Sequence, residues 1–291
     1  MKITGNKLDY LVSSAAKRVR GVGSSCPSCR SSDSSLVAHK YWITQLRRCS
    51  QCRLLFRTPT TSNAENADFY QQRYTQGFTT DLPDPATLLR LKQDAFAGTE
   101  KDYSRFIDVF DALGVPRGSR IFDFGCSWGY GSWQFRQRGY DVESYEISSS
   151  RGEYAAARLG CKIHSDFSSI KPGFDVFFSS HVLEHVPSVR EVIRLGMSIL
   201  RPGGMFIAFS PNGAAAHRLT DPAGWQQSWG LVHPNLLDDE YYHHQFGGLS
   251  YLLSSDPYDL RAIHRWAIGN EAQHTLGLSG GELMCAARID Q

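Results

Sequence analysis

One stretch of the sequence decides the fold: Ile121-Phe-Asp-Phe-Gly-Cys-Ser-Trp-Gly-Tyr-Gly-Ser132. It has the pattern of a buried strand that ends near Asp123, a loop with Gly125, Gly129 and Gly131, and a helix start at the last residue. A strand that stops at a glycine-rich turn and opens a helix lets a ligand approach bare backbone. The D-x-G-x3-G-x-G spacing differs from the G-x-G-x-x-G of dinucleotide sites, and no Lys-Ser/Thr pair follows to make a phosphate loop.

The next segments continue a βαβ pattern. Residues 140–146 are typical of a second strand that ends in a carboxylate, Glu146, 23 residues after Asp123. An acid at this point of a βαβ unit can accept hydrogen bonds from two ribose hydroxyls. Residues 150–159 predict a helix, and residues 161–166 predict a short third strand. The apolar run 174–180 suits a central parallel strand that is buried on both faces.

The glycine turn resembles motif I of the Rossmann-like S-adenosylmethionine-dependent methyltransferases. Two later segments strengthen the resemblance: His181-Val-Leu-Glu-His185-Val is similar to the family's hxLEHV motif, and residues 199–212 are similar to its LkPGGxhhhxxPN segment. The resemblance implies an α/β fold with a seven-stranded, mostly parallel sheet, and S-adenosylmethionine as the cofactor. It implies these cofactor-binding residues: Asp123, Gly125, Cys126, Gly129, Gly131, Glu146, Ile147, Asp166, Phe167 and His181.

Within that set, the resemblance implies a division of roles. The three glycines would lie at the methionine end of the cofactor, and Glu146 would bind the ribose. Asp166 would meet the adenine amino group beside the backbone N–H of Phe167.

Four cysteines predict a metal site near the N-terminus. Cys26-Pro-Ser-Cys29 and Cys49-Ser-Gln-Cys52 are two C-x2-C knuckles separated by nineteen residues. This spacing is within the range of a four-thiolate zinc ribbon, and four thiolates leave no open coordination position. We therefore expect structural Zn²⁺. The chain has seven cysteines and no recognisable signal peptide, which favours reduced thiols or metal over a disulfide framework.

The net charge of +2 conceals two modules of opposite sign. Residues 1–57 hold eleven Lys and Arg against two acids, and the remaining 234 residues hold twenty against twenty-seven. Such asymmetry indicates modules with different tasks. We predict a basic N-terminal segment (1–23), the zinc ribbon (24–58), a linker with a helical lid (59–113) and the S-adenosylmethionine-binding domain (114–291).

The sequence predicts a cytoplasmic protein without a membrane span. It has no run of 18 apolar residues and no apolar signal-peptide region at its start. Residues 1–20 have the pattern of a basic amphipathic helix, which would either contact a membrane surface or pack on the protein itself. The oligomeric state has no signal in the sequence.

The linker contains the aromatic cluster 69–74. Related enzymes with this domain order place such a cluster over the cofactor pocket, so the resemblance adds Tyr74 to the cofactor-binding residues. Ordinary packing of these aromatic side chains is the alternative. Residues 86–113 are rich in helix formers and predict the helical start of the catalytic domain.

The C-terminal region departs from the plain superfamily core. Trp225, Trp229 and His233 are groups that could hold a hydroxylated, ring-shaped substrate. Residues 248–253 predict a helix, and residues 262–267 and 283–289 predict the last two strands. The acidic and imidazole side chains of residues 238–244 (Asp238, Glu240, His243 and His244) predict either a second metal site or a solvated surface loop.

The whole chain resembles bacterial methyltransferases that join an N-terminal zinc ribbon to the methyltransferase domain, many of which modify nucleotide-linked sugars or polysaccharides. It lacks the long C-terminal domain of the deoxysugar C-methyltransferases, which favours O-methyl transfer. The base would be His185 or His233, because a histidine is neutral enough at pH 7 to accept a proton. Two alternatives stay open: His185 ties its loop to a backbone group, or Glu184 and His185 bind a divalent metal.

Other functions fit parts of the pattern. An RNA methyltransferase would use the basic ribbon for phosphates, although the N/D-P-P-Y/F motif of base amino-group methylation is absent. A non-catalytic binding scaffold would have no reason to keep both Glu146 and Asp166. The ribbon arginines (Arg47, Arg48, Arg53 and Arg57) would either contact an anionic acceptor or join the ribbon to its acidic neighbour.

Overall fold

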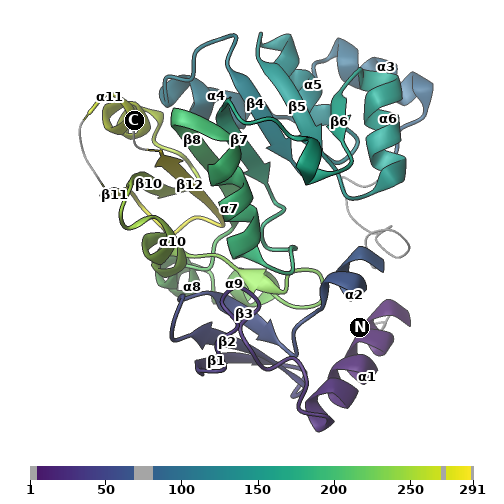
Figure 1. Cartoon of the computed structure of the whole chain (residues 1–291), viewed down its shortest axis with the longest axis vertical. Helices are drawn as coiled ribbons and strands as arrows, with labels where there is room; N and C mark the ends of the chain where they lie inside the picture. The colour runs from purple at the N-terminus through teal and green to yellow at the C-terminus, as the bar shows by residue number, and fades with distance from the viewer. Residues whose placement is uncertain (1–4, 69–80, 270–272, 290–291) are drawn as a thin grey trace.

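The computed structural model describes residues 5–68, 81–269 and 273–289. In these residues, an eight-stranded sheet forms the larger body of the molecule, and a four-stranded sheet lies at its lower end in Figure 1. The strand order of the large sheet is β11-β10-β12-β8-β7-β4-β5-β6. Its strands are β4 (Arg120–Phe124), β5 (Asp141–Tyr145), β6 (Lys162–His164), β7 (Phe174–Ser180), β8 (Leu200–Pro211), β10 (Ser250–Ser255), β11 (Gln273–Thr275) and β12 (Glu282–Arg288).

The predicted mostly parallel α/β sheet is confirmed. Strands β4 to β8 pair in parallel, and β12 runs antiparallel between β8 and β10. The sheet has one strand more than the seven expected, because the short β11 pairs in parallel with β10. Its three residues are too few to leave a signal in the sequence.

Two C-terminal elements were predicted wrongly. Residues 248–253 lie mostly in β10, where Tyr251, Leu252 and Leu253 are buried between two neighbouring strands, rather than in a helix. Residues 262–267 lie in α11 (Leu260–Ile268) rather than in a strand. Its buried residues recur at helical spacing, and Asp259 caps it by accepting a hydrogen bond from the Ala262 amide at 3.0 Å.

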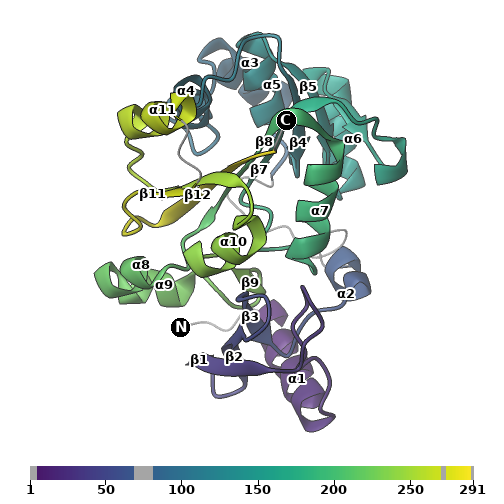
Figure 2. The ribbon, with the colours of Figure 1, turned by 60° about the vertical axis from the view of Figure 1, so that its left-hand side comes forward.

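Helices cover both faces of the large sheet (Figures 1 and 2). One core includes residues of α3 (Pro85–Gln93), α4 (Ser104–Ala112), α5 (Tyr130–Gln137), α6 (Ser149–Leu159) and α11. The other includes residues of α7 (Val189–Ile199) and α10 (Asp239–Phe246). Strand β7 contributes to both, with Val176 and Phe178 in the first core and Phe177 in the second. This two-sided burial is what its apolar sequence predicted.

The ribbon forms the small sheet, in the order β1-β2-β3-β9. Its strands are β1 (Ser34–Lys40), β2 (Thr44–Cys49), β3 (Leu55–Thr58) and β9 (Asn235–Leu236). The last strand comes from the catalytic part of the chain, and Figure 2 places it with α10 between the ribbon and the large sheet. Cys26, Cys49 and Phe56 also belong to the core that contains α7 and α10. The ribbon is therefore joined to its neighbour by a shared sheet and a shared core.

The remaining helices are α1 (Gly5–Val19), α2 (Asn63–Asp68), α8 (Ala215–Thr220) and α9 (Pro222–Gln227). Within the described parts of the chain, no helix is both long and apolar enough to cross a membrane.

Candidate active site

A cavity of about 830 Å³ lies where the parallel strands end. The residue that follows each of β4, β5 and β7 lines it: Gly125, Glu146 and His181. Ligands of open α/β sheets bind at the carboxyl ends of the strands. Further lining residues come from loops and helices, and they include Tyr103, Arg105, Ser127, Tyr130, Ile147, Phe167, Glu184, His185, Glu191 and His233.

The three glycines of the turn have different surroundings. Gly125 lines the cavity with φ +86°, and a Cβ there would collide with Val182. Gly129 and Gly131 are not among the lining residues. A Cβ at Gly129 would come within 2.8 Å of both Ala155 and Cys161, and one at Gly131 would collide with the Tyr103 ring. These two glycines allow close packing behind the turn, a requirement that the sequence pattern alone does not distinguish from cofactor contact.

Asp123 and Cys126 are buried next to the glycine turn and do not line the cavity. The Asp123 carboxylate accepts a hydrogen bond from Ser132 Oγ at 2.5 Å. Burial raises its pKa to about 7, the Ser132 hydroxyl opposes that shift, and the Glu146 carboxylate adds to it. Burial also raises the pKa of the Cys126 thiol. The predicted cofactor contact of both residues stays a prediction.

Glu146 lies in the cavity wall with its carboxylate held in place. The backbone amides of Ser127 and Ser148 each donate to it at 2.9 Å. Burial raises the pKa of Glu146, and the two amide donors counteract that shift. Carboxylate oxygens have lone pairs left for other donors, so the side chain is preorganised to accept hydroxyl groups. Ile147 lines the cavity beside it.

The two residues predicted to bind adenine, Asp166 and Phe167, have different surroundings. Phe167 lines the cavity and packs on Tyr145 with ring centroids 4.3 Å apart. Asp166 is exposed and outside the lining, and its carboxylate accepts hydrogen bonds from the Ser168 amide and hydroxyl. Its predicted adenine contact stays a prediction. Tyr74, the expected lid residue, lies outside the described residues.

His181 follows β7 and lies between two carboxylates. Its Nε2 is 2.6 Å from Glu282 Oε2, and its Nδ1 is 3.5 Å from Glu184 Oε1. Burial disfavours the imidazolium, but the two carboxylates raise the pKa of His181 to about 10. Glu282 also pairs with Arg105, at 2.8 Å. Sequence reasoning missed Glu282 because it lies on β12, 101 residues further along the chain.

His185 and His233, the two predicted bases, lie side by side in the cavity wall. Their ring centroids are 4.6 Å apart. His185 Nδ1 is 2.8 Å from the Val232 carbonyl oxygen, and His233 Nδ1 is 2.9 Å from that of Ser228. Burial lowers the pKa of His185 to about 4, although the Glu184 carboxylate opposes the shift. The predicted backbone contact of His185 is present, and the side chain nevertheless lines the cavity.

Glu184 completes this group. It is fully buried, and neither carboxylate oxygen has a hydrogen-bond partner among the described residues. Its Oε1 is 3.7 Å from His185 Nε2. Burial alone would raise the pKa of Glu184, but the neighbouring imidazoles of His185 and His181 lower it to about 2. Glu184, His185 and His233 each offer a ligand atom, and these three atoms lie within 4.8 Å of one another.

Strand β9 brings His233 to this position. The Asn235 amide donates to the Glu184 carbonyl at 3.1 Å, and Asn235 Nδ2 donates to the Val186 carbonyl at 2.6 Å. On its other side, the same segment pairs with the ribbon, where the Arg57 amide donates to the Pro234 carbonyl at 2.8 Å. No pattern in the sequence indicates this contact, which is why the third member of the cluster was not evident there.

The four ribbon cysteines converge as predicted. Their sulfur atoms lie within 4.8 Å of one another, with Cys26–Cys52 at 3.5 Å and Cys29–Cys49 at 3.4 Å. The two knuckles repeat one hydrogen-bond pattern, in which the amide of the residue after the second cysteine donates to the carbonyl of the first. These residues, Arg30 and Arg53, have φ of 68° and 64°.

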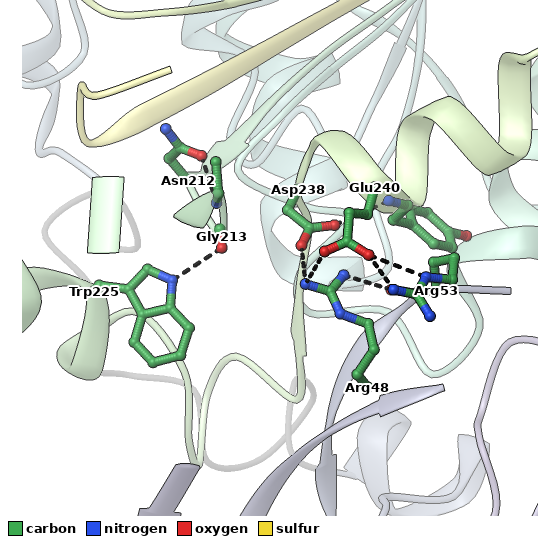
Figure 3. Close-up of polar contacts among 9 residues, drawn as sticks. Arg48, Arg53, Asn212, Gly213, Trp225, Asp238 and Glu240 are labelled. Carbon is green, nitrogen blue, oxygen red and sulfur yellow. Dashed lines mark hydrogen bonds and ion pairs between the residues drawn. The ribbon is translucent and has the colours of Figure 1, made fainter. Parts of the chain in front are cut away.

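None of the ribbon arginines is among the residues that line the cavity, and Figure 3 shows two of them, Arg48 and Arg53, turned toward Asp238 and Glu240. Arg48 Nη2 lies 2.6 Å from Asp238 Oδ2 and 3.3 Å from Glu240 Oε1. Arg53 pairs with Glu240 as well, its Nε donating at 3.0 Å. Arg57 is buried, and its guanidinium stacks on the Tyr10 ring. These contacts agree with the docking interpretation of the basic ribbon.

The acidic segment is therefore divided in the described structure: Asp238 is buried, whereas Glu240, His243 and His244 are exposed, as expected of a solvated surface. The three exposed residues lie on α10 rather than in a loop, and the segment contributes to no group with metal-ligand spacing among the described residues. Asp238 is 1% exposed and caps α10, accepting a hydrogen bond from the Tyr241 amide at 2.9 Å. Among the described residues, two groups have the spacing of metal ligands, and both lie elsewhere: the four ribbon cysteines, and Glu184 with His185 and His233. The prediction missed Asp238's role because its partner Arg48 is 190 residues earlier in the sequence.

The two predicted substrate-binding tryptophans are buried instead. Trp225 and Trp229 pack with Leu46, Leu55 and Leu236 between the ribbon and the catalytic part of the chain. The Trp225 indole donates to the Gly213 carbonyl at 3.0 Å, as Figure 3 shows. The segment presents only His233 to the cavity.

The N-terminal helix was predicted either to meet a membrane or to pack on the protein. Lys17 on α1 donates to the Thr60 carbonyl at 3.0 Å and pairs with Glu65 at 2.6 Å. Arg18 donates to the Ile43 carbonyl at 3.0 Å. These contacts support the packing interpretation.

Comparison with known proteins agrees with this geometry. Residues 97–249 match the family described as "Methyltransferase domain". The fold is similar to that of the plantazolicin methyltransferase BpumL in complex with SAH, with a TM-score of 0.50, 13% identity, and 78% of this chain and 94% of the other covered. The plantazolicin methyltransferase BamL has a TM-score of 0.50, 11% identity, and coverage of 77% and 94%. The chain therefore belongs to the methyltransferase domain family and is a methyltransferase.

Proposed function

We propose that this methyltransferase transfers the methyl group to a hydroxyl oxygen of a sugar, either nucleotide-linked or part of a polysaccharide or glycolipid. The observation that carries the proposal is the single cavity that contains Glu146 and Phe167 together with Glu184, His185 and His233. One set offers contacts for a nucleoside, and the other offers imidazole and carboxylate groups to a hydroxyl. An acceptor between the two sets could lie in line with the methyl–sulfur bond.

In this proposal, the cofactor lies along the ends of the parallel strands. The methionine moiety lies on the turn at Gly125, where a side chain would not fit. Glu146 accepts hydrogen bonds from the ribose hydroxyls, and Phe167 packs on the adenine. Asp123, Gly129 and Gly131 shape the turn from behind.

His185 and His233 are the proposed groups that promote loss of the acceptor's proton. Both line the cavity, and both have Nδ1 in contact with a backbone carbonyl. A neutral imidazole that donates its Nδ1–H to a carbonyl presents an unprotonated Nε2. Such a nitrogen can accept a proton or bind a cation.

The RNA alternative receives less support from the structure. It depends on a basic ribbon that attracts phosphates, but Arg48 and Arg53 are paired with Asp238 and Glu240. The same contacts remove the main argument for an anionic acceptor that is recruited by the ribbon arginines. A cytoplasmic location and the four-part domain division stay predictions.

We also propose that the four cysteines bind structural Zn²⁺. The shortest sulfur separations of 3.4 and 3.5 Å are close to the roughly 3.8 Å expected around tetrahedral zinc with bonds of about 2.3 Å. Bound zinc would hold the two knuckles together and so fix β1, β2 and β3, whose edge pairs with β9.

The function is tested by methyl transfer from labelled S-adenosylmethionine. The full chain is incubated with nucleotide sugars, a bacterial glycolipid extract and RNA in parallel, and the labelled product is identified by mass spectrometry. Label in a sugar hydroxyl supports the proposal, and label in RNA without any sugar product overturns it. The Glu146→Ala variant is the control for background transfer, because it should bind the cofactor weakly.

A further inference from the structure

We propose that Glu184, His185 and His233 bind a divalent transition-metal cation within the methyl-transfer cavity. The inference rests on the proposed function for its catalytic consequence, but the site itself follows from the geometry of these three side chains. None of the family motifs used above requires His233, which joins the cluster only through the fold.

Glu184 lies in an environment that favours a bound cation. Its carboxylate is 0% exposed, and both oxygens lack a hydrogen-bond partner among the described residues. A buried carboxylate without donors is costly unless a cation neutralises it. His181 is the nearby cationic side chain, but its Nε2 is bonded to Glu282 at 2.6 Å and its Nδ1 is 3.5 Å from Glu184. A cation between Glu184 and the two other imidazoles would satisfy the unbonded oxygens.

The two histidines have the orientation of metal ligands. A histidine that binds a metal through one ring nitrogen almost always donates its other N–H to a carbonyl, carboxylate or water. His185 and His233 both have Nδ1 against a backbone carbonyl, at 2.8 and 2.9 Å. This leaves Nε2 of each ring as the ligand atom, with the tautomer set by the backbone.

The ligand atoms of the three side chains lie close together. The three ligand atoms lie within 4.8 Å of one another, and Glu184 Oε1 is 3.7 Å from His185 Nε2. Metal–ligand bonds of about 2.1 Å limit any two ligand atoms to about 4.2 Å apart. The most distant pair therefore needs to close by at most about 0.6 Å to meet that limit, and by at most about 1.4 Å to reach the roughly 3.4 Å separation of a tetrahedral site.

The donor set indicates the kind of cation. Two imidazoles and one carboxylate suit Zn²⁺, Fe²⁺, Mn²⁺ or Co²⁺ better than Mg²⁺, which prefers oxygen ligands. Three protein ligands leave a coordination position for substrate, as in catalytic zinc sites. Since all three residues line the cavity, that position is accessible to an acceptor.

The cation gives methyl transfer a defined proton path. The acceptor hydroxyl binds the cation, which lowers the hydroxyl's pKa, and its proton leaves to water. The resulting oxygen lone pair forms the new C–O bond while the methyl C–S bond breaks. The electron pair of that bond stays on sulfur, and S-adenosylhomocysteine is released. Under this scheme His185 and His233 are ligands rather than proton acceptors.

The test counts metal ions independently of activity. The full chain is purified without chelators, its bound metals are measured by elemental analysis, and Mn²⁺ is then titrated in while the EPR signal of unbound Mn²⁺ is followed. Mn²⁺ is a poor ion for the ribbon thiolates. We expect resident metal plus bound Mn²⁺ to total two equivalents per chain, one in the ribbon and one in the cavity.

Two cavity variants test whether the second metal ion binds at Glu184 and His233. His233→Gln and Glu184→Gln should each reduce the total to one. His264→Ala, which removes a histidine on α11 with a similar Nδ1–carbonyl contact to Ala112, should leave the total at two. Circular dichroism checks that each variant is folded. A total of one in the wild-type protein, or of two in both folded cavity variants, would overturn the site.

Kinetics separate a ligand from a base. If His233 is a ligand, then His233→Gln should need at least about tenfold more metal for half-maximal rate, and added metal should restore much of kcat. If His233 is a base instead, His233→Gln should have a reduced kcat at every metal concentration, and that result would contradict the proposal. If two metals bind but no acceptor in the panel is methylated, then the proposed function fails and the metal site stands. If sugars are methylated while only one metal ion is bound per chain, then the proposed function stands and the metal site fails.

Discussion

Two clusters of potential metal ligands among the described residues differ in composition and in access. The thiolate cluster (Cys26, Cys29, Cys49 and Cys52) has four soft ligands and lies outside the cavity lining. The imidazole–carboxylate cluster (Glu184, His185 and His233) has three harder ligands, all in the cavity wall. Four protein ligands close a tetrahedral site, whereas three leave a position for substrate. The first arrangement suits a structural ion and the second suits a catalytic one.

The clusters are also connected. Phe56 on β3 pairs with Asn235 on β9, and Asn235 is bonded to the Glu184 and Val186 carbonyls. His233 precedes this strand by two residues. Through β9 the ribbon therefore packs against the segment that carries His233, and in the proposed function this contact would help to position that side chain.

A substitution in the thiolate cluster should have the largest effect on stability and metal content. We expect Cys49→Ser to abolish ribbon zinc binding and to lower the free energy of unfolding by several kcal/mol, because zinc binding contributes directly to folding. Since β3 holds β9, the variant should also lose affinity for the cavity metal. Calorimetric unfolding, zinc content and Mn²⁺ titration on the same sample measure the three effects.

The control for Cys49→Ser is Cys161→Ser, which alters a buried cysteine outside both clusters. Its zinc content should stay unchanged. A Cys49→Ser protein with normal cavity-metal affinity would show that the ribbon does not position His233.

Removing the ion pair behind the ribbon should have the next largest effect. In Arg48→Ala, Asp238 would keep its buried carboxylate without a guanidinium 2.6 Å away. Breaking a buried pair in this way costs about 3–5 kcal/mol. Burial already raises the pKa of Asp238 to about 6 despite the opposing effect of Arg48, so the uncompensated charge should be costly. Chemical denaturation monitored by fluorescence measures the change.

Arg53→Ala is the matched comparison, since Arg53 and its partner Glu240 are both 43% exposed. An exposed pair contributes about 0–1 kcal/mol. Equal losses in the two variants would contradict the distinction between a buried and an exposed pair. A raised KM for the acceptor in Arg48→Ala, without a loss of stability, would restore the anion-recruitment hypothesis.

The contrast between the clusters also explains what the sequence could predict. The thiolate cluster was predicted completely, because each pair of ligands lies within four residues and C-x2-C spacing is specific. The strands that precede Gly125 and Glu146 were predicted for the same reason, since strand, turn and helix follow one another locally. Local patterns therefore sufficed wherever the structural unit is short.

The rest depends on contacts between distant segments. Glu282 meets His181 only after β12 has paired with β8, and His233 meets His185 only after β9 has paired with the ribbon. Trp225 and Trp229 were assigned to substrate because aromatic side chains near polar ones suit both a sugar site and a domain interface. Only the tertiary packing against Leu46 and Leu55 distinguishes these two possibilities.

Weakening the cofactor end should leave both metal clusters intact. Glu146→Ala removes charge-assisted hydrogen bonds to the ribose, each worth about 1.5–3 kcal/mol, which corresponds to roughly a 10- to 150-fold loss in affinity. Calorimetric titration with S-adenosylmethionine measures the loss, and the total metal content should remain two equivalents. Unchanged cofactor affinity would remove Glu146 from the proposed ribose site. A concurrent loss of metal would show that the two ends of the cavity are not independent.

The smallest effect concerns a region outside both clusters. Glu143 on β5 pairs with Lys162 at 2.7 Å, His164 at 2.6 Å and Arg120 at 3.1 Å. Burial alone would raise its pKa, but these partners lower it to about 2, from an ordinary value of 4.5. A lowered pKa in the folded state stabilises the protein above the unfolded pKa, and this contribution is lost as the pH falls from about 4.5 toward 2.

Acid also releases metal from both clusters, because their ligands bind metal only when deprotonated. The Glu143→Gln variant separates two causes of the loss of stability at low pH, the protonation of Glu143 and the release of metal. At pH 7 the variant should be about 1–2 kcal/mol less stable than the wild type, since Lys162 and Arg120 are partly exposed and screened by solvent. The difference should shrink as the pH falls below 4.5, while metal release should follow the same pH dependence in both proteins. Urea denaturation and zinc release, measured across the pH series, provide the two curves. A stability difference that does not change with pH would mean that Glu143 acts through packing rather than through its charge.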